Sequence, residues 1–194
     1  MPSTESTRPG SPAEAEQLLR DAGALLEGHF QLTSGKHSLL YVEKFRLLER
    51  PPHTEALCRM IADWARDLDT QLVAGPTTGG GIISYEVARL LGTRGIFAES
   101  DNGGRAFKRG FQIGAGERVL IVDDVLSTGG SLRDVIDAVR REGGEPCGIA
   151  ALVDRTAGKT GFGLPFFACL SLEVPAYDAD DCPGCRDGVP LVIT

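Results

Sequence analysis

Two adjacent carboxylates, Asp123 and Asp124, stand just before the hydroxyl- and glycine-rich run Ser-Thr-Gly-Gly-Ser at residues 127–131. Small hydroxyls and free backbone N–H groups at a helix N-terminus favour a phosphate, and Gly129 and Gly130 let the backbone approach it closely. The carboxylates would repel a phosphate, but they can accept two hydrogen bonds from a ribose diol or bind a hydrated Mg²⁺. Together these residue types predict a site that holds a ribose 5-phosphate at both ends.

The flanking residues predict the elements that position this site. The apolar run at residues 119–122 is typical of a strand buried on both faces, and apolar Leu132, Val135, Ile136 and Val139 follow at helical spacing. In open α/β sheets, ligands bind beyond the carboxyl ends of the strands. A phosphoacceptor aspartate would not need this loop, and the G-x-G-x-x-G pattern of a dinucleotide site is absent after the strand.

The stretch Arg118–Ser131 closely resembles the diphosphoribosyl-binding signature of type I phosphoribosyltransferases. The resemblance implies that the two acids are catalytic and address the ribose hydroxyls of phosphoribosyl pyrophosphate, while the loop wraps its 5′-phosphate. The binding residues that it implies are Asp123, Asp124, Val125, Leu126, Ser127, Thr128, Gly129, Gly130 and Ser131.

A second glycine loop lies between an expected strand at residues 72–74 and a helix from about Ile82. In this family the corresponding loop cradles the pyrophosphate through backbone amides, which implies that Thr77, Thr78 and Gly79 bind phosphoribosyl pyrophosphate. Several orotate enzymes of the family carry a lysine where Gly79 stands. We therefore expect that charge to come from elsewhere, from Mg²⁺ or from the following loop.

The following loop, residues 99–104, is polar and glycine-containing, and the alternation after it predicts a short β-ribbon. It is either a solvated hairpin or a mobile lid whose cations meet the departing pyrophosphate. In the family this loop carries lysines and often reaches the neighbouring subunit's site, but Ser100 stands here where a lysine is frequent. We assign Arg105 as the catalytic cation, with Lys108 and Arg109 behind it as further binding residues. The resemblance also implies a homodimer in which one of these cations serves the neighbouring site.

Two further segments resemble orotate phosphoribosyltransferases. Residues 28–38 contain a Phe-x-Leu-x-Ser-Gly-x-x-Ser segment that resembles the N-terminal hood lying over the base, and a plain hairpin turn is the alternative. Many members have a lysine where Thr33 stands, and Lys36 is the candidate substitute. An expected strand at residues 147–153 ends in Asp154-Arg155, where the family has an arginine that contacts orotate; a local ion pair within this dipeptide is the alternative. The orotate-binding residues are then Ser127, Arg155 and Lys36, and we interpret His29 and His37 as surface or turn residues.

The cysteine pattern is not that of a disulfide framework, since Cys58, Cys147 and Cys169 lie in apolar patterns typical of a core. The remaining pair forms Cys182-Pro183-Gly184-Cys185. A single C-x-x-C without a second pair or a histidine is weak evidence for zinc. It resembles the C-terminus of a subgroup of bacterial orotate enzymes, and we interpret it as a structural cap, with metal binding as the lesser alternative.

The alternation of strands and helices predicts an α/β fold, a central mostly parallel sheet with helices on both faces, plus a small N-terminal hood. We expect a disordered tail at residues 1–10 and one domain at 11–194, with a hood at about 11–50, a core at about 51–175 and a C-terminal cap at about 176–194. Ser11, Pro12 and Glu14 predict a capped helix start. Pro51 and Pro52 are expected to break the chain before a helix at about 54–67.

The net charge and the distribution of apolar residues argue against two classes of protein, nonspecific nucleic-acid binders and membrane-spanning proteins. The net charge of −7 argues against nonspecific nucleic-acid binding, and no apolar run is long enough for a membrane span. The polar N-terminus lacks an apolar signal core, so we expect a cytoplasmic protein.

The resemblance implies an Mg²⁺-dependent orotate phosphoribosyltransferase, which joins orotate to phosphoribosyl pyrophosphate to give orotidine 5′-phosphate and pyrophosphate in pyrimidine synthesis. We assign no residue as a certain direct ligand of Mg²⁺. A purine-type phosphoribosyltransferase would share the phosphate loop without needing Arg155 or the hood. A ligand-sensing regulator of the same fold would usually add a basic DNA-binding segment.

Overall fold

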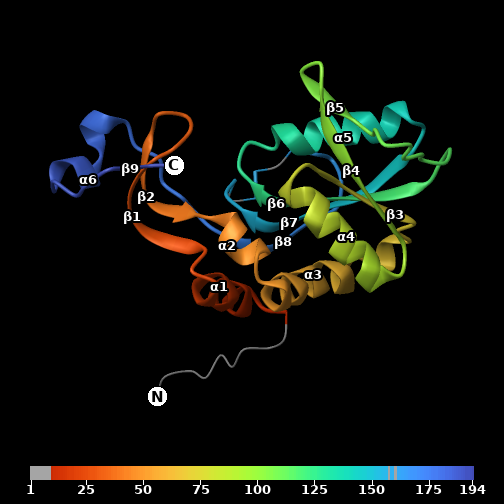
Figure 1. Ribbon diagram of the computed structural model, residues 1–194, viewed down its shortest axis with the longest axis horizontal. Coiled ribbons are helices and arrows are strands. Elements are labelled where there is room, and N and C mark those ends of the chain that lie inside the picture. Colours follow the sequence, from red (N-terminus) through yellow and green to blue (C-terminus); the bar gives the residue numbers. More distant parts are fainter. Residues whose placement is uncertain (1–9, 157, 160) are drawn as a thin grey trace.

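The computed structural model describes residues 10–156, 158–159 and 161–194, and its centre is a six-stranded sheet (Figure 1). The strand order is β5-β4-β3-β6-β7-β8, and every neighbouring pair is parallel except β4 and β5. The strands are β3 (Leu72–Pro76), β4 (Arg94–Asp101), β5 (Gly104–Ala106), β6 (Arg118–Leu126), β7 (Glu145–Asp154) and β8 (Phe166–Ser171). The predicted mostly parallel sheet and the short antiparallel ribbon at its edge are confirmed.

Helices cover both faces of this sheet, as predicted (Figure 1). On one face α1 (Pro12–Asp21), α3 (Pro51–Ala65) and α4 (Gly79–Leu91) form a core with the side chains of Leu120 and Val122. On the other face α5 (Gly130–Arg141) packs against Val119 and Ile121. Alternate residues of a strand face opposite sides, so Asp123 continues the α5 side of β6 and Asp124 continues the α4 side.

The hood is a separate three-stranded sheet beside the carboxyl ends of the central strands (Figure 1). Its strands β1 (Leu25–Gln31) and β2 (His37–Val42) are antiparallel, and β9 (Val192–Ile193), near the C-terminus, pairs in parallel with β1. Helix α2 (Lys44–Leu48) leads from the hood to α3. The expected N-terminal hood is confirmed, but the C-terminus supplies one of its strands.

Several element boundaries differ from the predicted ones. Ser11 caps α1 as expected, accepting a hydrogen bond from the N–H of Glu14. The predicted break before this helix is present, since α2 ends at Leu48, but the prolines belong to the helix that follows: α3 begins at Pro51 rather than at about Thr54. Proline is tolerated in the first turn of a helix, where its missing N–H would have no partner within the helix. Helix α4 likewise begins within the glycine loop, at Gly79 rather than near Ile82.

The predicted tail at residues 1–10 lies outside the described residues except for Gly10. The division of the chain into hood, core and cap stays a prediction. Short 3₁₀ turns at Arg66–Leu68 and Ala179–Asp181 and the helix α6 (Pro183–Arg186) complete the elements of the described chain. None of its helices has both the length and the apolar character that a membrane crossing requires.

Candidate active site

The acidic pair lies at the carboxyl end of β6, in the middle of the sheet. Only 9% of Asp123 and 3% of Asp124 is exposed. Oδ1 of Asp123 accepts a hydrogen bond of 2.8 Å from the N–H of Asp124, and Oδ1 of Asp124 accepts one from the N–H of Val125. Burial, and next to it the charge of Asp124, raise the pKa of Asp123. The two carboxylates are therefore held in fixed orientations before any ligand arrives.

Lys44, at the start of α2, reaches across from the hood to the acidic pair. Its Nζ lies 3.1 Å from Oδ1 and 3.0 Å from Oδ2 of Asp124. No sequence pattern singles out Lys44, which is only one lysine at the junction of a strand and a short helix. The contact joins residues eighty positions apart, which no local pattern indicates.

Gly79 explains why a lysine is absent from the pyrophosphate loop. A Cβ atom at this position would collide with Oδ2 of Asp124. A larger side chain at residue 79 would therefore displace a buried carboxylate. Lys44 brings a cation to the same carboxylate from the other direction.

The loop between β6 and α5 encloses a small hollow of about 40 Å³. The structure thus brings together the predicted phosphate-binding residues and Asp123. The free N–H groups at the start of α5 favour an anion at this loop. The hollow is lined by Asp123, Val125, Leu126, Ser127, Thr128, Gly129, Gly130, Ser131 and Leu132.

A larger cavity of about 500 Å³ lies between the hood and the same loop. Arg155 belongs to its lining, and the Nε of this residue is buried without a hydrogen-bond partner among the described residues. Burial lowers the pKa of Arg155. The cavity is lined by Leu32, Thr33, Ser34, Tyr41, Val42, Glu43, Lys44, Phe45, Val125, Ser127, Thr128, Arg155 and Thr194.

Asp154 does not form the ion pair that was the alternative for Arg155. Its Oδ1 accepts hydrogen bonds from the N–H and the hydroxyl of Thr156, and its Oδ2 accepts one from the N–H of Gly158. Asp154 therefore stabilises the loop after β7. Arg155 is not paired with it and lines the cavity instead.

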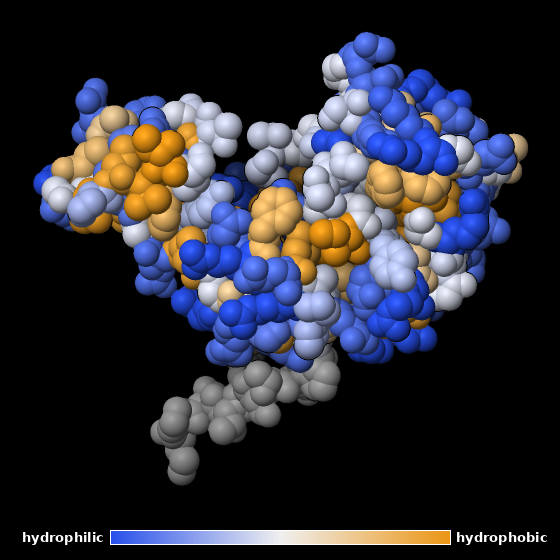
Figure 2. Space-filling view, in the orientation of Figure 1, coloured by the Kyte–Doolittle hydropathy of each residue, from blue (hydrophilic) through white to orange (hydrophobic). Residues whose placement is uncertain are grey.

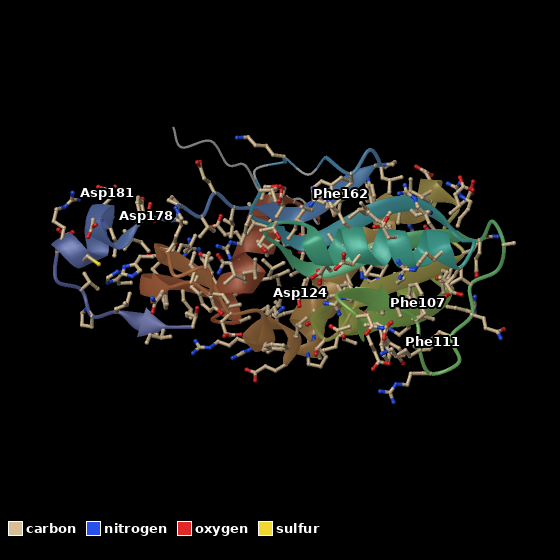
Figure 3. All side chains as sticks on the ribbon, turned by 90° about the horizontal axis from the view of Figure 1, so that it is seen from above. Phe107, Phe111, Asp124, Phe162, Asp178 and Asp181 are labelled. Carbon is tan, nitrogen blue, oxygen red and sulfur yellow. The ribbon has the colours of Figure 1, made fainter. Side chains whose placement is uncertain are left out.

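Lys36 is not among the residues that line this cavity. Its Nζ lies 3.3 Å from Oδ1 of Asp178 in an exposed ion pair. Figure 3 shows Asp178 at the outer end of the hood, well away from Asp124. Two neighbours of Lys36 in the turn, Thr33 and Ser34, do line the cavity.

The three cations after the loop at residues 99–104 make contacts within their own chain. Nη1 of Arg105 donates to Oγ1 of Thr77 at 3.1 Å and lies 3.3 Å from the carbonyl oxygens of Thr77 and Ala98. Arg109 pairs with both carboxylate oxygens of Glu99, and Lys108 pairs with Asp101. Arg105 thus holds the loop that carries Thr77, while the other two cations brace the β4–β5 hairpin.

A further open hollow, of about 600 Å³, lies at the amino ends of β4 and β6 and includes Arg94 and Glu117. These two residues form an ion pair of 2.7 Å. The hollow is at the opposite end of the strands from the acidic pair, and ligands in such sheets bind at the carboxyl ends. We therefore place the active site in the two hollows around β6 and α5.

Comparison with known proteins agrees with this arrangement. Residues 48–161 match the family described as "Phosphoribosyl transferase domain". The orotate phosphoribosyltransferase of Pelotomaculum thermopropionicum is 47% identical over 179 residues, which cover 92% of this chain and 94% of that relative.

Two solved structures are similar in both fold and sequence. The orotate phosphoribosyltransferase of Aeropyrum pernix has a TM-score of 0.68 at 26% identity and covers 80% of this chain and 92% of its own. The enzyme of Mycobacterium tuberculosis H37Rv, in complex with inorganic phosphate, has a TM-score of 0.67 at 26% identity and covers 85% of this chain and 97% of its own. The chain therefore belongs to the phosphoribosyl transferase family and, within it, to the orotate phosphoribosyltransferases.

Proposed function

We propose that the two connected hollows bind phosphoribosyl pyrophosphate and orotate and convert them to orotidine 5′-phosphate and pyrophosphate. The observation that carries the orotate assignment concerns Arg155. Its buried Nε has no hydrogen-bond partner among the described residues, and it belongs to a cavity that adjoins the phosphate loop. A buried N–H of a guanidinium without a partner is costly, and a planar carboxylate can satisfy it through charge-assisted hydrogen bonds.

The 5′-phosphate of the sugar occupies the hollow at residues 123–132, where backbone N–H groups and hydroxyls can donate to it. The complex of the M. tuberculosis relative with inorganic phosphate supports an anion of this class. The ribose then lies beside Asp123 and Asp124, whose carboxylates accept hydrogen bonds from its two hydroxyls.

The reaction replaces the pyrophosphate at the anomeric carbon by the base nitrogen. Positive charge develops on the sugar as the pyrophosphate leaves, and the fixed carboxylates stabilise that charge without reorganising. The hood and Arg155 hold orotate at the face from which it attacks, so that binding energy is used for positioning. No covalent intermediate with the protein is required.

Mg²⁺ fits this site, because Asp123 and Asp124 offer carboxylate oxygens that suit a hard cation. We propose that these two residues hold it, directly or through its water molecules. When bound with the substrate, Mg²⁺ neutralises charge on the pyrophosphate and ribose oxygens. Lys44 supplies a positive charge at Asp124 from the protein itself.

Arg105, Thr77, Thr78 and Gly79 form the pyrophosphate side of the proposed site. The contacts of Arg105 within its own chain favour a role in shaping the loop of that same chain. Lys108 and Arg109 remain candidates for contact with pyrophosphate, which would compete with Asp101 and Glu99 for their charges.

A homodimer is supported by apolar side chains on α2 and α4. Phe45, Ile82 and Tyr85 are 50%, 41% and 70% exposed, and Figure 2 shows apolar residues gathered over these two helices. Ile82 and Tyr85 line an open hollow of about 400 Å³ that also contains Thr77 and Thr78. Exposed apolar patches of this kind are typical of subunit interfaces, and a second subunit here would lie against the pyrophosphate loop.

The test offers the purified protein Mg²⁺ and phosphoribosyl pyrophosphate with orotate, uracil, hypoxanthine, xanthine and adenine in separate reactions. We expect efficient nucleotide formation with orotate alone, since only orotate brings a carboxylate to Arg155. Faster turnover of a purine would reject the substrate assignment, and binding of phosphoribosyl pyrophosphate without turnover of any base would favour a sensor.

A further inference from the structure

Four potential metal ligands meet at the outer end of the hood, away from the active site. They are His29 of β1, His37 of β2, and Cys182 and Cys185 at the start of α6. One donor atom from each lies within 4.8 Å of the other three. The interpretation of His29 and His37 as surface or turn residues is wrong, since they are only 2% and 5% exposed and belong to strands.

The spacings within this His₂Cys₂ cluster match those of a tetrahedral zinc site. Nε2 of His29 lies 3.0 Å from Nδ1 of His37 and 3.3 and 3.7 Å from the sulfurs of Cys182 and Cys185. Nδ1 of His37 lies 3.2 Å from the sulfur of Cys185. Ordinary zinc–nitrogen and zinc–sulfur bond lengths place tetrahedral ligand atoms about 3.3 to 3.8 Å apart. Small movements of these side chains would therefore admit an ion.

The hydrogen bonding of His29 presents the correct nitrogen to the centre of the cluster. Its Nδ1 lies 2.8 Å from the carbonyl oxygen of Val189, which can only accept a hydrogen bond. The proton of a neutral His29 is thus fixed on Nδ1, and Nε2 keeps its lone pair toward the two sulfurs. Histidine ligands of metals almost always donate their other ring N–H to a carboxylate, a backbone carbonyl or a water molecule.

The backbone also brings the two cysteines close to the histidines. A Cβ atom at Gly184 would lie 2.7 Å from the ring of His29, so only glycine allows the C-x-x-C turn to pack on this ring. His37 exchanges two backbone hydrogen bonds of 2.8 Å with Tyr177, which ties β2 to the segment that leads into the cysteines. The cluster is therefore held by the backbone as well as by its side chains.

We propose that this cluster binds one structural Zn²⁺ through Nε2 of His29, Nδ1 of His37 and the thiolates of Cys182 and Cys185. Four nitrogen and sulfur donors with no open position are the ligand set of structural zinc, and two thiolates balance the charge of the ion. The ion fastens the C-terminal segment to the hood. Because β9 and Thr194 follow from this segment, zinc also stabilises one wall of the orotate cavity.

The first test measures the metal content of the full-length protein, purified under reducing conditions without a metal-affinity step. We expect about one zinc per chain. Cys182→Ser and Cys185→Ser should each lose most of it, while Cys147→Ser, which removes a buried thiol elsewhere, should keep it. Zinc in both ligand variants at the wild-type level would overturn the proposal.

A second test uses only the wild-type protein, so that misfolding of a variant cannot obscure the answer. The reduced protein is stripped with a chelator and titrated with Co²⁺, and the visible spectrum is recorded. We expect the intense bands of tetrahedral cobalt and a sulfur-to-cobalt charge-transfer band, which saturate at one equivalent and disappear when Zn²⁺ is added. The proposal is overturned if the protein is purified without zinc and also gives no tetrahedral cobalt spectrum. This holds even if Cys182 and Cys185 form a disulfide on oxidation.

Discussion

Lys44 and Asp124 form an ion pair across the boundary between the hood and the core, with Nζ 3.0 Å from Oδ2. The carboxylate is almost fully buried, whereas the lysine is 37% exposed. This pair links the start of α2, the helix that leads out of the hood, to the acidic end of β6. Oδ2 of Asp124 fills the space that a side chain at residue 79 would need, so Gly79 is the residue that fits beside this ion pair.

Replacing Lys44 tests the importance of this pair. Lys44→Ala should lower kcat/KM by about ten- to a hundredfold, because a buried carboxylate loses its cation and its orientation. Lys44→Arg should recover part of the activity, since it keeps the charge. Lys36→Ala is the matched control, because it breaks only an exposed pair with Asp178, and its kinetics should be close to those of the wild type. Equal losses in Lys36→Ala and Lys44→Ala would contradict the assignment.

The raised pKa of Asp123 predicts an unusual dependence of stability on pH. Above the ordinary aspartate pKa, the folded protein keeps a proton at Asp123 that the unfolded chain releases. The free energy of unfolding should therefore fall as pH rises from about 4 through the raised pKa. This contribution is complete at low pH and is lost toward neutral pH.

Asp123→Asn should remove that dependence and stabilise the ligand-free protein by about 1–2 kcal/mol near neutral pH, although it reduces activity. Urea unfolding at about pH 5 and about pH 8 measures the effect. Asp178→Asn, at an exposed aspartate, serves as the control and should leave the dependence unchanged. An Asp123→Asn protein that is less stable at both pH values would show that the buried carboxylate stabilises the fold.

Arg155 should affect one substrate much more than the other. Arg155→Ala should raise the KM for orotate by about thirty- to a hundredfold, which corresponds to about 2–3 kcal/mol for a charge-assisted contact, and leave the KM for phosphoribosyl pyrophosphate nearly unchanged. Arg155→Lys should recover little, because an ammonium cannot form the paired contact of a planar guanidinium. Steady-state kinetics with each substrate varied in turn measure both values. Equal weakening of both would indicate that Arg155 supports the fold instead.

Arg105 can act in its own subunit or in the neighbouring one, and a mixing experiment distinguishes the two. Arg105→Ala should lower kcat, because Thr77 loses the guanidinium that holds its loop. This variant is mixed with an inactive Asp123→Asn/Asp124→Asn protein under conditions that exchange subunits. The contacts of Arg105 within its own chain predict that no activity returns. Partial recovery, with exchange confirmed by mass spectrometry, would instead place Arg105 in the neighbour's site, as the family resemblance suggests.

The parts of this structure that could be predicted from the sequence are those whose signals are local. The run Arg118–Ser131 contains a strand, an acidic pair, a loop and the start of a helix in order, and each part restricts the others. Arg155 was found because it directly follows a strand. The starts of α3 and α4 were placed several residues late, because proline and glycine, which end helices elsewhere, are tolerated in a first turn.

The features that could not be predicted from the sequence depend on contacts between residues far apart in the chain. Lys36 and Lys44 stand at the two ends of β2, and nothing in the sequence tells which of them faces the cavity; the structure places Lys44 there. The histidines of the His₂Cys₂ cluster precede its cysteines by about one hundred and fifty positions. Only the folded hood brings these histidines to the C-x-x-C pair, so the sequence around the cysteines does not reveal them.

Phosphoribosyl transfer at this site should depend on the carboxylates of Asp123 and Asp124. The rate of orotidine 5′-phosphate formation by the Asp123→Asn/Asp124→Asn protein measures that dependence. Asparagine keeps the size of each side chain and removes its charge. We expect kcat/KM to fall by about a thousandfold or more relative to the wild type, with an unchanged circular dichroism spectrum. A double variant that forms orotidine 5′-phosphate at a rate near that of the wild type would show that the reaction does not need these two carboxylates.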